Sequence, residues 1–142
     1  MTNIRFVYLY RDAGNYKQHG EAIFSNETLL QPGEVDKQIQ SFLSDGQFFI
    51  ARQVHVQERF FDVMNADDHP WHEYVKVEVT HDPTFDPGYD HKRDITEFLG
   101  ELEKVNQAGW DEMNVREDLI KQLDKERCEL KRWLDSVGAG TS

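Results

Sequence analysis

The stretch "NIRFVYLYRD", residues 3–12, decides the fold. It is dominated by β-branched and aromatic residues, which favour a strand over a helix. With the two-residue period of a strand, apolar side chains fall on both faces, with Ile4, Phe6, Tyr8 and Tyr10 on one and Val7 and Leu9 on the other. Both faces are therefore expected to be covered, which predicts an internal strand of a sheet.

Two further strands and a helix are predicted next. The turn-forming residues 13–20, "AGNYKQHG", and the apolar residues 21–25, "EAIFS", predict a hairpin with a long loop and a returning strand. Apolar residues at helical spacing predict a helix within 33–46 that stops at Gly46. Residues 47–51, "QFFIA", predict a short buried strand, and the irregular stretch after it has room for one helical turn near 58–61.

A fourth strand and a second helix follow. Residues 72–81, "HEYVKVEVTH", alternate cleanly, and one face of the predicted strand carries Glu73, Val75, Val77, Val79 and His81. Prolines and a glycine predict a loop over 82–91. Asp94 is then the expected cap of a helix over 95–105, whose buried stripe consists of Ile95, Phe98, Leu99, Leu102 and Val105.

Together these elements predict an α+β fold with one domain over residues 1–106, in which helices pack on a mostly antiparallel sheet of about four strands. Residues 107–142 are predicted to form a helical extension. Within it, residues 111–137 are expected to form a long helix or coiled-coil seam from Ile120, Leu123, Leu130, Leu134 and Val137. Packing back on the sheet and pairing with a second copy of the chain are both open.

Charge and composition narrow the class of partner. The 142 residues suffice for one domain with its own core. With 27 Asp and Glu against 16 Lys and Arg the net charge is −11, which disfavours nucleic acids and anionic lipid surfaces. No apolar run approaches the roughly 20 residues of a membrane span, and the lone Cys128 has no partner cysteine, so a cytoplasmic location is expected. A basic protein surface, a cation or a small ligand in a local pocket is the preferred partner, and plain solubility is the alternative reason for the acidity.

The first candidate binding segment is "YRDAGNYK", residues 10–17. Arg11, Lys17 and the backbone amides around Asn15 together suit a phosphate or a carboxylate, since a turn can aim N–H groups at an anion while cations neutralise it. Tyr10 and Tyr16 can stack on a ring. The alternative is an ordinary hairpin loop in which Arg11 pairs with a nearby acid and the tyrosines pack.

The second candidate segment is "DDHPWHE", residues 67–73. Asp67, Asp68, His69 and His72 are the types of side chain that zinc or manganese takes, with His55 or His81 as a further ligand from elsewhere. Pro70 favours an extended backbone before it, however, and the spacing matches no established metal motif. No metal or other cofactor is therefore predicted.

Glu73 connects the two segments. If the alternation is right, this acid shares a face with Val75 and Val77, so it needs an ion pair, a hydrogen bond or a shifted pKa. Arg11 or Tyr10 on the first strand is the expected partner, which predicts one pocket at a strand end. A purely structural Glu–Arg pair is the alternative.

The segments "YLYRDAGNYKQHGEAIFSN", "FFI" and "DDHPWHEY" resemble a family of small, uncharacterised bacterial and phage-type proteins with a Tyr-Arg-Asp, Asn-Tyr-Lys opening and an Asp-His, Trp-His-Glu segment. The resemblance covers about residues 4–100, and residues 107–142 look like an addition. It implies that the two segments belong together, and it implies no activity and no catalytic residue.

Three functions are open. The first is a non-enzymatic binding or regulatory module for a small anionic ligand or a basic protein, with binding residues Tyr10, Arg11, Asn15, Tyr16, Lys17, His69, Trp71, His72 and Glu73. The second is a metal-dependent hydrolase with His69, His72 and an aspartate as ligands and Glu73 as the base. The third is a structural protein that oligomerises through residues 111–137.

Overall fold

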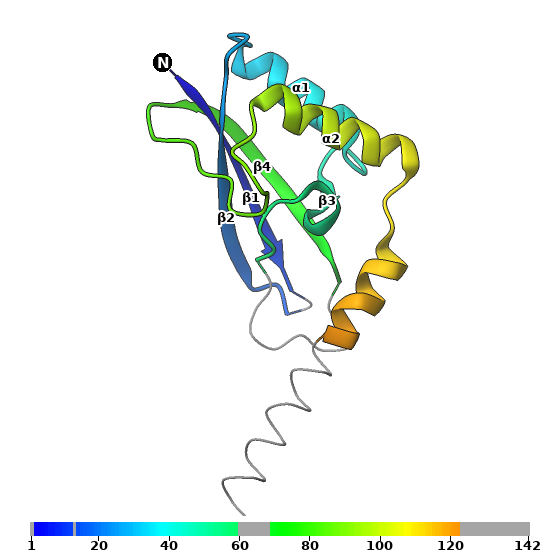
Figure 1. Ribbon diagram of the computed structural model, residues 1–142. Coiled ribbons are helices and arrows are strands. Elements are labelled where there is room, and N and C mark those ends of the chain that lie inside the picture. Colours follow the sequence, from blue (N-terminus) through cyan, green and yellow to red (C-terminus); the bar gives the residue numbers. More distant parts are fainter. Residues whose placement is uncertain (1, 13, 60–68, 123–142) are drawn as a thin grey trace, which may run out of the picture.

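The sheet is four-stranded and antiparallel throughout, in a computed structural model that describes residues 2–12, 14–59 and 69–122. The strands are β1 (Asn3–Arg11), β2 (Lys17–Ser25), β3 (Phe48–Ile50) and β4 (Trp71–Thr80), and their order in space is β2-β1-β4-β3 (Figure 1). The predicted α+β class and the four antiparallel strands are thus confirmed.

Strand β1 is internal, as its sequence predicts, and pairs with β2 on one side and β4 on the other. Its core face is buried completely at Ile4, Phe6, Tyr8 and Tyr10. The expectation that both faces are covered is wrong for much of the strand, because on the other face Leu9 is buried but Val7 is only half-buried. We call these two faces of the sheet the core face and the outer face.

The β1–β2 hairpin is tighter than the sequence predicts. Strand β2 begins at Lys17 rather than near residue 21, because the backbone closes through Asp12 N–H to Tyr16 O at 3.0 Å. Asn15 takes a left-handed conformation with φ 67°, which asparagine tolerates well. Gly20 therefore lies within the strand, where a Cβ would come 2.7 Å from the ring of Tyr8.

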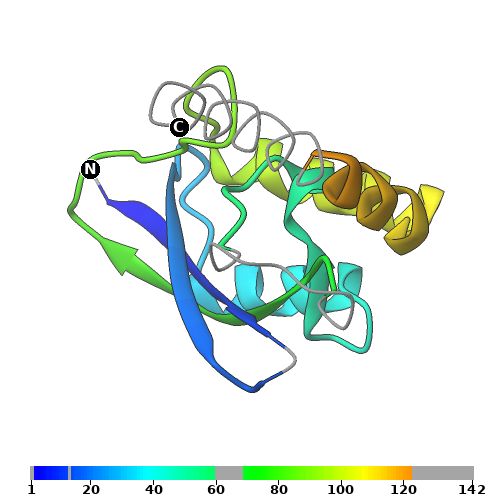
Figure 2. The ribbon, with the colours of Figure 1, turned by 90° about the horizontal axis from the view of Figure 1, so that it is seen from below.

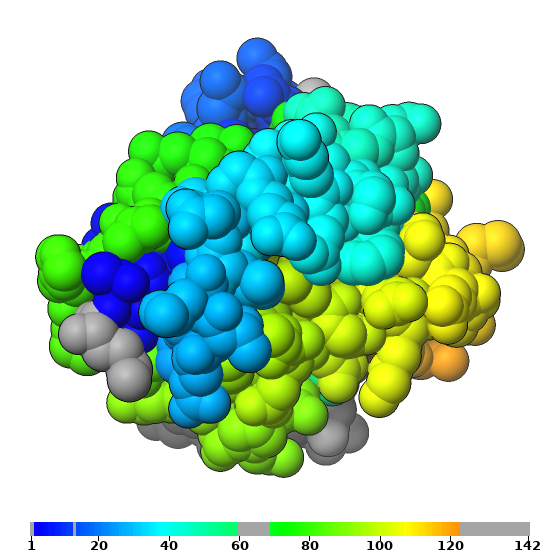
Figure 3. All heavy atoms as spheres, turned by 90° about the horizontal axis from the view of Figure 1, so that it is seen from above, coloured from blue at the N-terminus to red at the C-terminus, as the bar shows by residue number. Residues whose placement is uncertain are grey.

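Two helices cover the core face. Helix α1 (Pro32–Phe42) starts with Pro at its first turn and buries Val35 and Ile39. Helix α2 (Ile95–Ala108) is capped by Asp94 in a capping box and buries the predicted stripe, with Val105 partly buried beside it. The two helices lie side by side across this face of the molecule (Figures 2 and 3).

A β-bulge in β4 overturns the predicted alternation of residues 72–81. Tyr8 of β1 pairs with Tyr74 whereas Val7 pairs with Lys76, so Val75 is an extra residue that leaves the ladder. Beyond the bulge, the side chains of β4 point to the opposite faces from those that the simple alternation predicts. Glu73 therefore shares the outer face with Lys76 instead of with Val77, which lies across from the core residue Phe6.

Strand β3 forms as predicted, and a 3-10 helix, η1 (Ala51–Val54), follows it directly. The helical turn predicted near 58–61 falls partly outside the described residues. Between α1 and β3, Asp45 and Gly46 both have positive φ, 53° and 70°, as the central residues of a type I′ turn do. The Asp-Gly pair is a typical sequence for that turn.

The chain is helical again over residues 112–122, the last part of it that the structure describes. This helix packs back on the domain, since Val115 and Leu119 are buried against Ile50, with Trp71 and Trp110 beside them. A long helix over 111–137 is not shown, because residues 123–142 lie outside the described part. Ile120, the predicted start of the seam, is 43% exposed. Within the described ranges, every helix is too short or too polar to cross a lipid bilayer.

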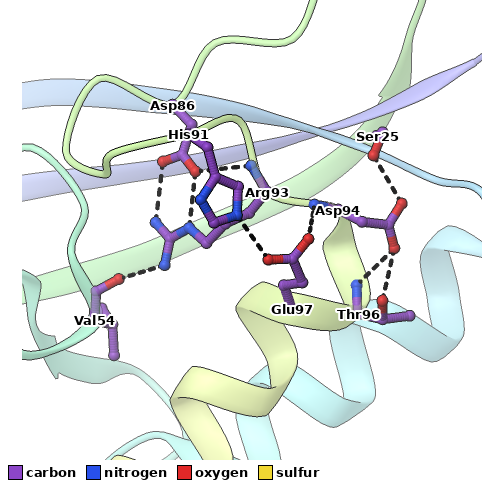
Figure 4. A network of polar contacts seen from close by, with 8 residues as sticks. All are labelled: Ser25, Val54, Asp86, His91, Arg93, Asp94, Thr96 and Glu97. Atoms are coloured by element: carbon purple, nitrogen blue, oxygen red, sulfur yellow. Dashed lines mark hydrogen bonds and ion pairs between the residues drawn. The ribbon is translucent and has the colours of Figure 1, made fainter.

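A buried ion pair fixes the loop before α2 (Figure 4). The guanidinium of Arg93 holds Asp86 at 2.7 and 3.0 Å, and it also donates to the carbonyls of Val54 and His55 at 2.8 and 2.9 Å. The centroid of the Tyr89 ring lies 4.4 Å from the guanidinium carbon of Arg93. Because the hydrogen-bonding groups of this pair are satisfied inside the protein, we interpret it as structural.

Candidate functional site

Strand β1 ends and strand β4 begins at the same end of the sheet (Figure 1). A cavity of about 530 Å³ lies there. Its walls come from the hairpin, the turn between α1 and β3, strands β3 and β4, and the start of helix 112–122. The lining residues are Arg11, Asp12, Ser44, Asp45, Phe48, His69, Trp71, Glu73 and Glu112. We call this cavity the acidic pocket.

The sheet register places an ion pair in the wall of the acidic pocket. Arg11 Nε lies 2.8 Å from Glu73 Oε2, and the Glu73 side chain is only 13% exposed. Gln47 Nε2 donates to the other carboxylate oxygen at 3.0 Å. Arg11 Nη1 donates in turn to Asn15 Oδ1. The predicted contact between Glu73 and Arg11 is therefore confirmed, although it forms on the outer face and not beside the valines.

Two loops bring further carboxylates to the pocket. Asp12 is held at the end of the hairpin, where its Oδ1 accepts the Tyr16 N–H at 2.9 Å. Asp45 projects from the left-handed turn between α1 and β3 and is exposed. The carboxylates of Asp45 and Glu112 make no hydrogen bond or ion pair with any residue in 2–12, 14–59 or 69–122. Two carboxylates of the pocket therefore have no neutralising partner within the described chain.

Aromatic side chains form the apolar part of the pocket. Phe48 and Trp71 alternate with Phe49 and His72, which face the core, so both belong to the outer face. The indole of Trp71 lies 6.1 Å from that of Trp110, in the small cluster that also seats helix 112–122. The pocket thus combines aromatic surface with a carboxylate rim.

Tyr10 and His72, two of the predicted binding residues, belong to the core. The Tyr10 hydroxyl donates to the carbonyl of His69 at 2.8 Å, and its ring lies 5.1 Å from that of His72. His72 accepts the Arg59 N–H at its Nε2 and contacts the Pro70 carbonyl through its Nδ1 at 3.2 Å. Burial lowers the pKa of His72 to about 3, and the contact with the Pro70 carbonyl acts in the opposite direction. With both ring nitrogens engaged, His72 has no lone pair free for a metal.

The remaining predicted binding residues fall into those that line or support the acidic pocket and those that do not. His69 and Trp71 line the acidic pocket, and Asn15 supports Arg11 from the hairpin. Tyr16, 70% exposed, and Lys17 are also on the hairpin but do not line it. The first segment therefore contributes Arg11 and Asp12 rather than a cradle for an anion.

The proposed metal ligands do not come together in the described part of the chain. No group of three or more His, Cys, Asp or Glu side chains suits a metal ion there. Asp67 and Asp68 lie outside the described residues. His55 stacks edge-on against Tyr89 at 5.2 Å, and His81 is exposed after the far end of β4.

Five lining residues are not among the binding residues that the sequence predicts, namely Asp12, Ser44, Asp45, Phe48 and Glu112. The Asp45-Gly46 pair carries a recognisable turn signal, but the helical pattern before it indicates only that Gly46 ends a helix. Nothing local marks Glu112, because it reaches the pocket through the packing of its helix on Ile50.

The charges in the wall of the acidic pocket indicate which kind of group it can bind. Among the described residues, its wall contains four carboxylates against one guanidinium, Arg11, which is already paired with Glu73. Such a site attracts a positively charged group. Comparisons with protein-family models, with curated proteins and with solved structures find no match for this chain. The resemblance to bacterial and phage-type proteins stays a prediction.

Proposed function

We propose that this protein is a non-enzymatic binding module whose acidic pocket takes a basic segment of a partner protein. The observation that carries the proposal is the excess of carboxylates around aromatic surface in a cavity of about 530 Å³. A cation gains from both, through ion pairs at the rim and through cation–π contact with Trp71 or Phe48. The lone Cys128 fits a protein of the reducing cytoplasm. The net charge of −11 fits a positively charged partner.

The alternative of a small anionic ligand has weaker support from the geometry. Of the described lining residues only Arg11 carries a guanidinium or an ammonium group, and its Nε and Nη1 are bonded to Glu73 and Asn15. An anion in this pocket would also meet Asp12, Asp45 and Glu112, which repel it. A basic partner faces no such repulsion.

The test is a calorimetric titration with the peptide acetyl-Gly-Arg-Lys-Arg-Gly-amide and with its acidic counterpart, acetyl-Gly-Glu-Asp-Glu-Gly-amide. We expect the basic peptide alone to bind, with an affinity that falls as salt is added. Asp45→Asn combined with Glu112→Gln should weaken binding about tenfold, since each lost rim pair contributes roughly 0.7 kcal/mol. Asparagine suits the left-handed backbone at position 45, so this variant keeps the turn.

Asp90→Asn combined with Glu117→Gln is the matched control, because both residues are exposed and lie outside the pocket. Arg11→Gln separates the two ligand classes. It should leave the affinity for the basic peptide unchanged or raise it, because Glu73 loses its partner. Absence of binding by the basic peptide, or binding of the acidic peptide that is lost in Arg11→Gln, would overturn the proposal.

A further inference from the structure

The acidic pocket already shows how a guanidinium is held at this end of the sheet. Arg11 is bonded along its edge, with Nε on Glu73 and Nη1 on Asn15, while Gln47 orients the carboxylate from the other side. A guanidinium presents five N–H donors in one plane, and this edge-on bonding uses that plane. The wall is therefore built around a planar cation.

The part of the acidic pocket that Arg11 does not occupy also offers carboxylates to a cation. Asp45 and Glu112 stand without partners in the described chain and come from two separate elements, a turn and a helix. Trp71 and Phe48 supply aromatic faces in the same cavity. A planar cation lying on an aromatic face keeps its edge N–H groups free for carboxylates at the rim, so one guanidinium can serve both kinds of contact at once.

We infer that the group recognised in the acidic pocket is the guanidinium of an arginine side chain on the partner, in preference to a lysine ammonium. The inference rests on the proposed function, since it names the residue that a basic partner inserts. A lysine ammonium is a compact and strongly hydrated charge, which loses more hydration on aromatic surface and cannot bridge two rim carboxylates in one plane. The carbon stem of either side chain fills the apolar part equally, so the preference lies in the head group.

The experiment compares three acetylated and amidated tripeptides, Gly-Arg-Gly, Gly-Lys-Gly and Gly-citrulline-Gly, by calorimetry on the full chain. Citrulline matches arginine in shape but carries no charge. We expect the arginine peptide to bind about tenfold more tightly than the lysine peptide, and the citrulline peptide not to bind. The comparison is made on the unaltered protein, so it does not depend on how a variant folds.

Trp71→Phe and Trp71→Leu then test the aromatic contact. Trp71→Phe should keep most of the preference for arginine, and Trp71→Leu should reduce it to about twofold or less. Phe85→Leu is the aromatic control, because Phe85 is 45% exposed and lies outside the acidic pocket. The basic pentapeptide, which contains both arginine and lysine, reports whether the Trp71 variants still bind.

Failure of the inference and failure of the proposed function give different results. Equal affinities for the arginine and lysine tripeptides would overturn the guanidinium preference and leave the basic-partner proposal standing. Binding of the citrulline peptide as tightly as the arginine peptide would also overturn the guanidinium preference, because charge would then be irrelevant to this subsite, and the pentapeptide titration would decide the basic-partner proposal by itself. If neither tripeptide nor the basic pentapeptide binds, both proposals are wrong.

Discussion

At the scale of single residues, His72 is the most unusual group of the fold. It is fully buried among Tyr8, Tyr10 and Phe49, with both ring nitrogens bonded to backbone atoms. Such a histidine is kept neutral, because a buried imidazolium would lack solvation. What looked in the sequence like a metal ligand or a binding residue is a satisfied core side chain.

This environment predicts a pH dependence of stability. The pKa of His72 falls from its ordinary value of 6.5 to about 3 on folding. Below pH 6.5 the unfolded chain takes up a proton that the folded chain refuses, so stability falls as the pH drops towards 3. From pH 7 to pH 4 the free energy of unfolding should decrease by about 3 kcal/mol more in the native protein than in His72→Gln, whose amide oxygen can still accept the Arg59 N–H.

Urea unfolding at several pH values between 4 and 7 measures this difference. His81→Gln, at an exposed position, is the control and should run parallel to the native protein. If His72→Gln also runs parallel to it, His72 is solvated in the folded state and the described contacts are wrong.

At the scale of elements, helix 112–122 packs on the domain through residues outside the predicted seam, of which only Ile120 lies among the described residues. The 3-4 spacing that starts at Ile120 predicts a seam, but the residues buried on the domain are Val115 and Leu119. Val115 and Leu119 are buried because the helix covers the apolar surface of Ile50 in β3 and Trp71 in β4, which both belong to the outer face. The same packing brings Glu112 to the acidic pocket.

Truncation of two adjacent residues tests this helix face. Leu119→Ala should lower the free energy of unfolding by about 2–3 kcal/mol, since Leu119 is 5% exposed and the change leaves a cavity. Ile120→Ala, at 43% exposure, should cost below about 1 kcal/mol. Urea unfolding of both variants measures this. Equal losses would place Ile120 in a buried seam, as the sequence pattern suggested.

At the scale of the whole molecule, the Arg93–Asp86 pair joins segments that are far apart in the chain. Its contacts extend from η1, through the carbonyl of Val54, to β2 and α2, whose rings of Phe24 and Phe98 lie 5.4 and 5.3 Å from the guanidinium carbon. It therefore stabilises the arrangement of the elements rather than any one of them. The acidic pocket needs that arrangement, because its walls come from five separate segments.

Loss of one partner from this pair should be costly. Arg93→Met or Asp86→Leu alone is expected to lower the free energy of unfolding by about 3–5 kcal/mol, because each leaves a buried charge unpaired. The double variant should lose clearly less than the sum of the two. Arg5→Met is the control, as Arg5 pairs with acids at the more exposed outer face and should cost clearly less than either single change in the buried pair. Additive losses in the double variant would contradict a direct pair.

The sequence by itself determined the local structure of this protein and the order of its elements. Period-two patterns predicted the strands, and the Asp94 cap with its apolar stripe predicted α2, since these signals lie within a few residues of one another. It also predicted that Glu73 and Arg11 meet, which strand pairing brought about across 62 positions of the chain.

Only the tertiary structure decided which side chains share the acidic pocket. The bulge at Val75 moved Glu73 to the outer face, and packing on Ile50 brought in Glu112. Both depend on the register and packing of segments that are distant in the chain, where a single extra residue exchanges the two faces of a strand. No local spacing encodes that outcome, so the charge of the pocket emerged only from the folded chain, and it favours the basic protein among the partners that the net charge leaves open.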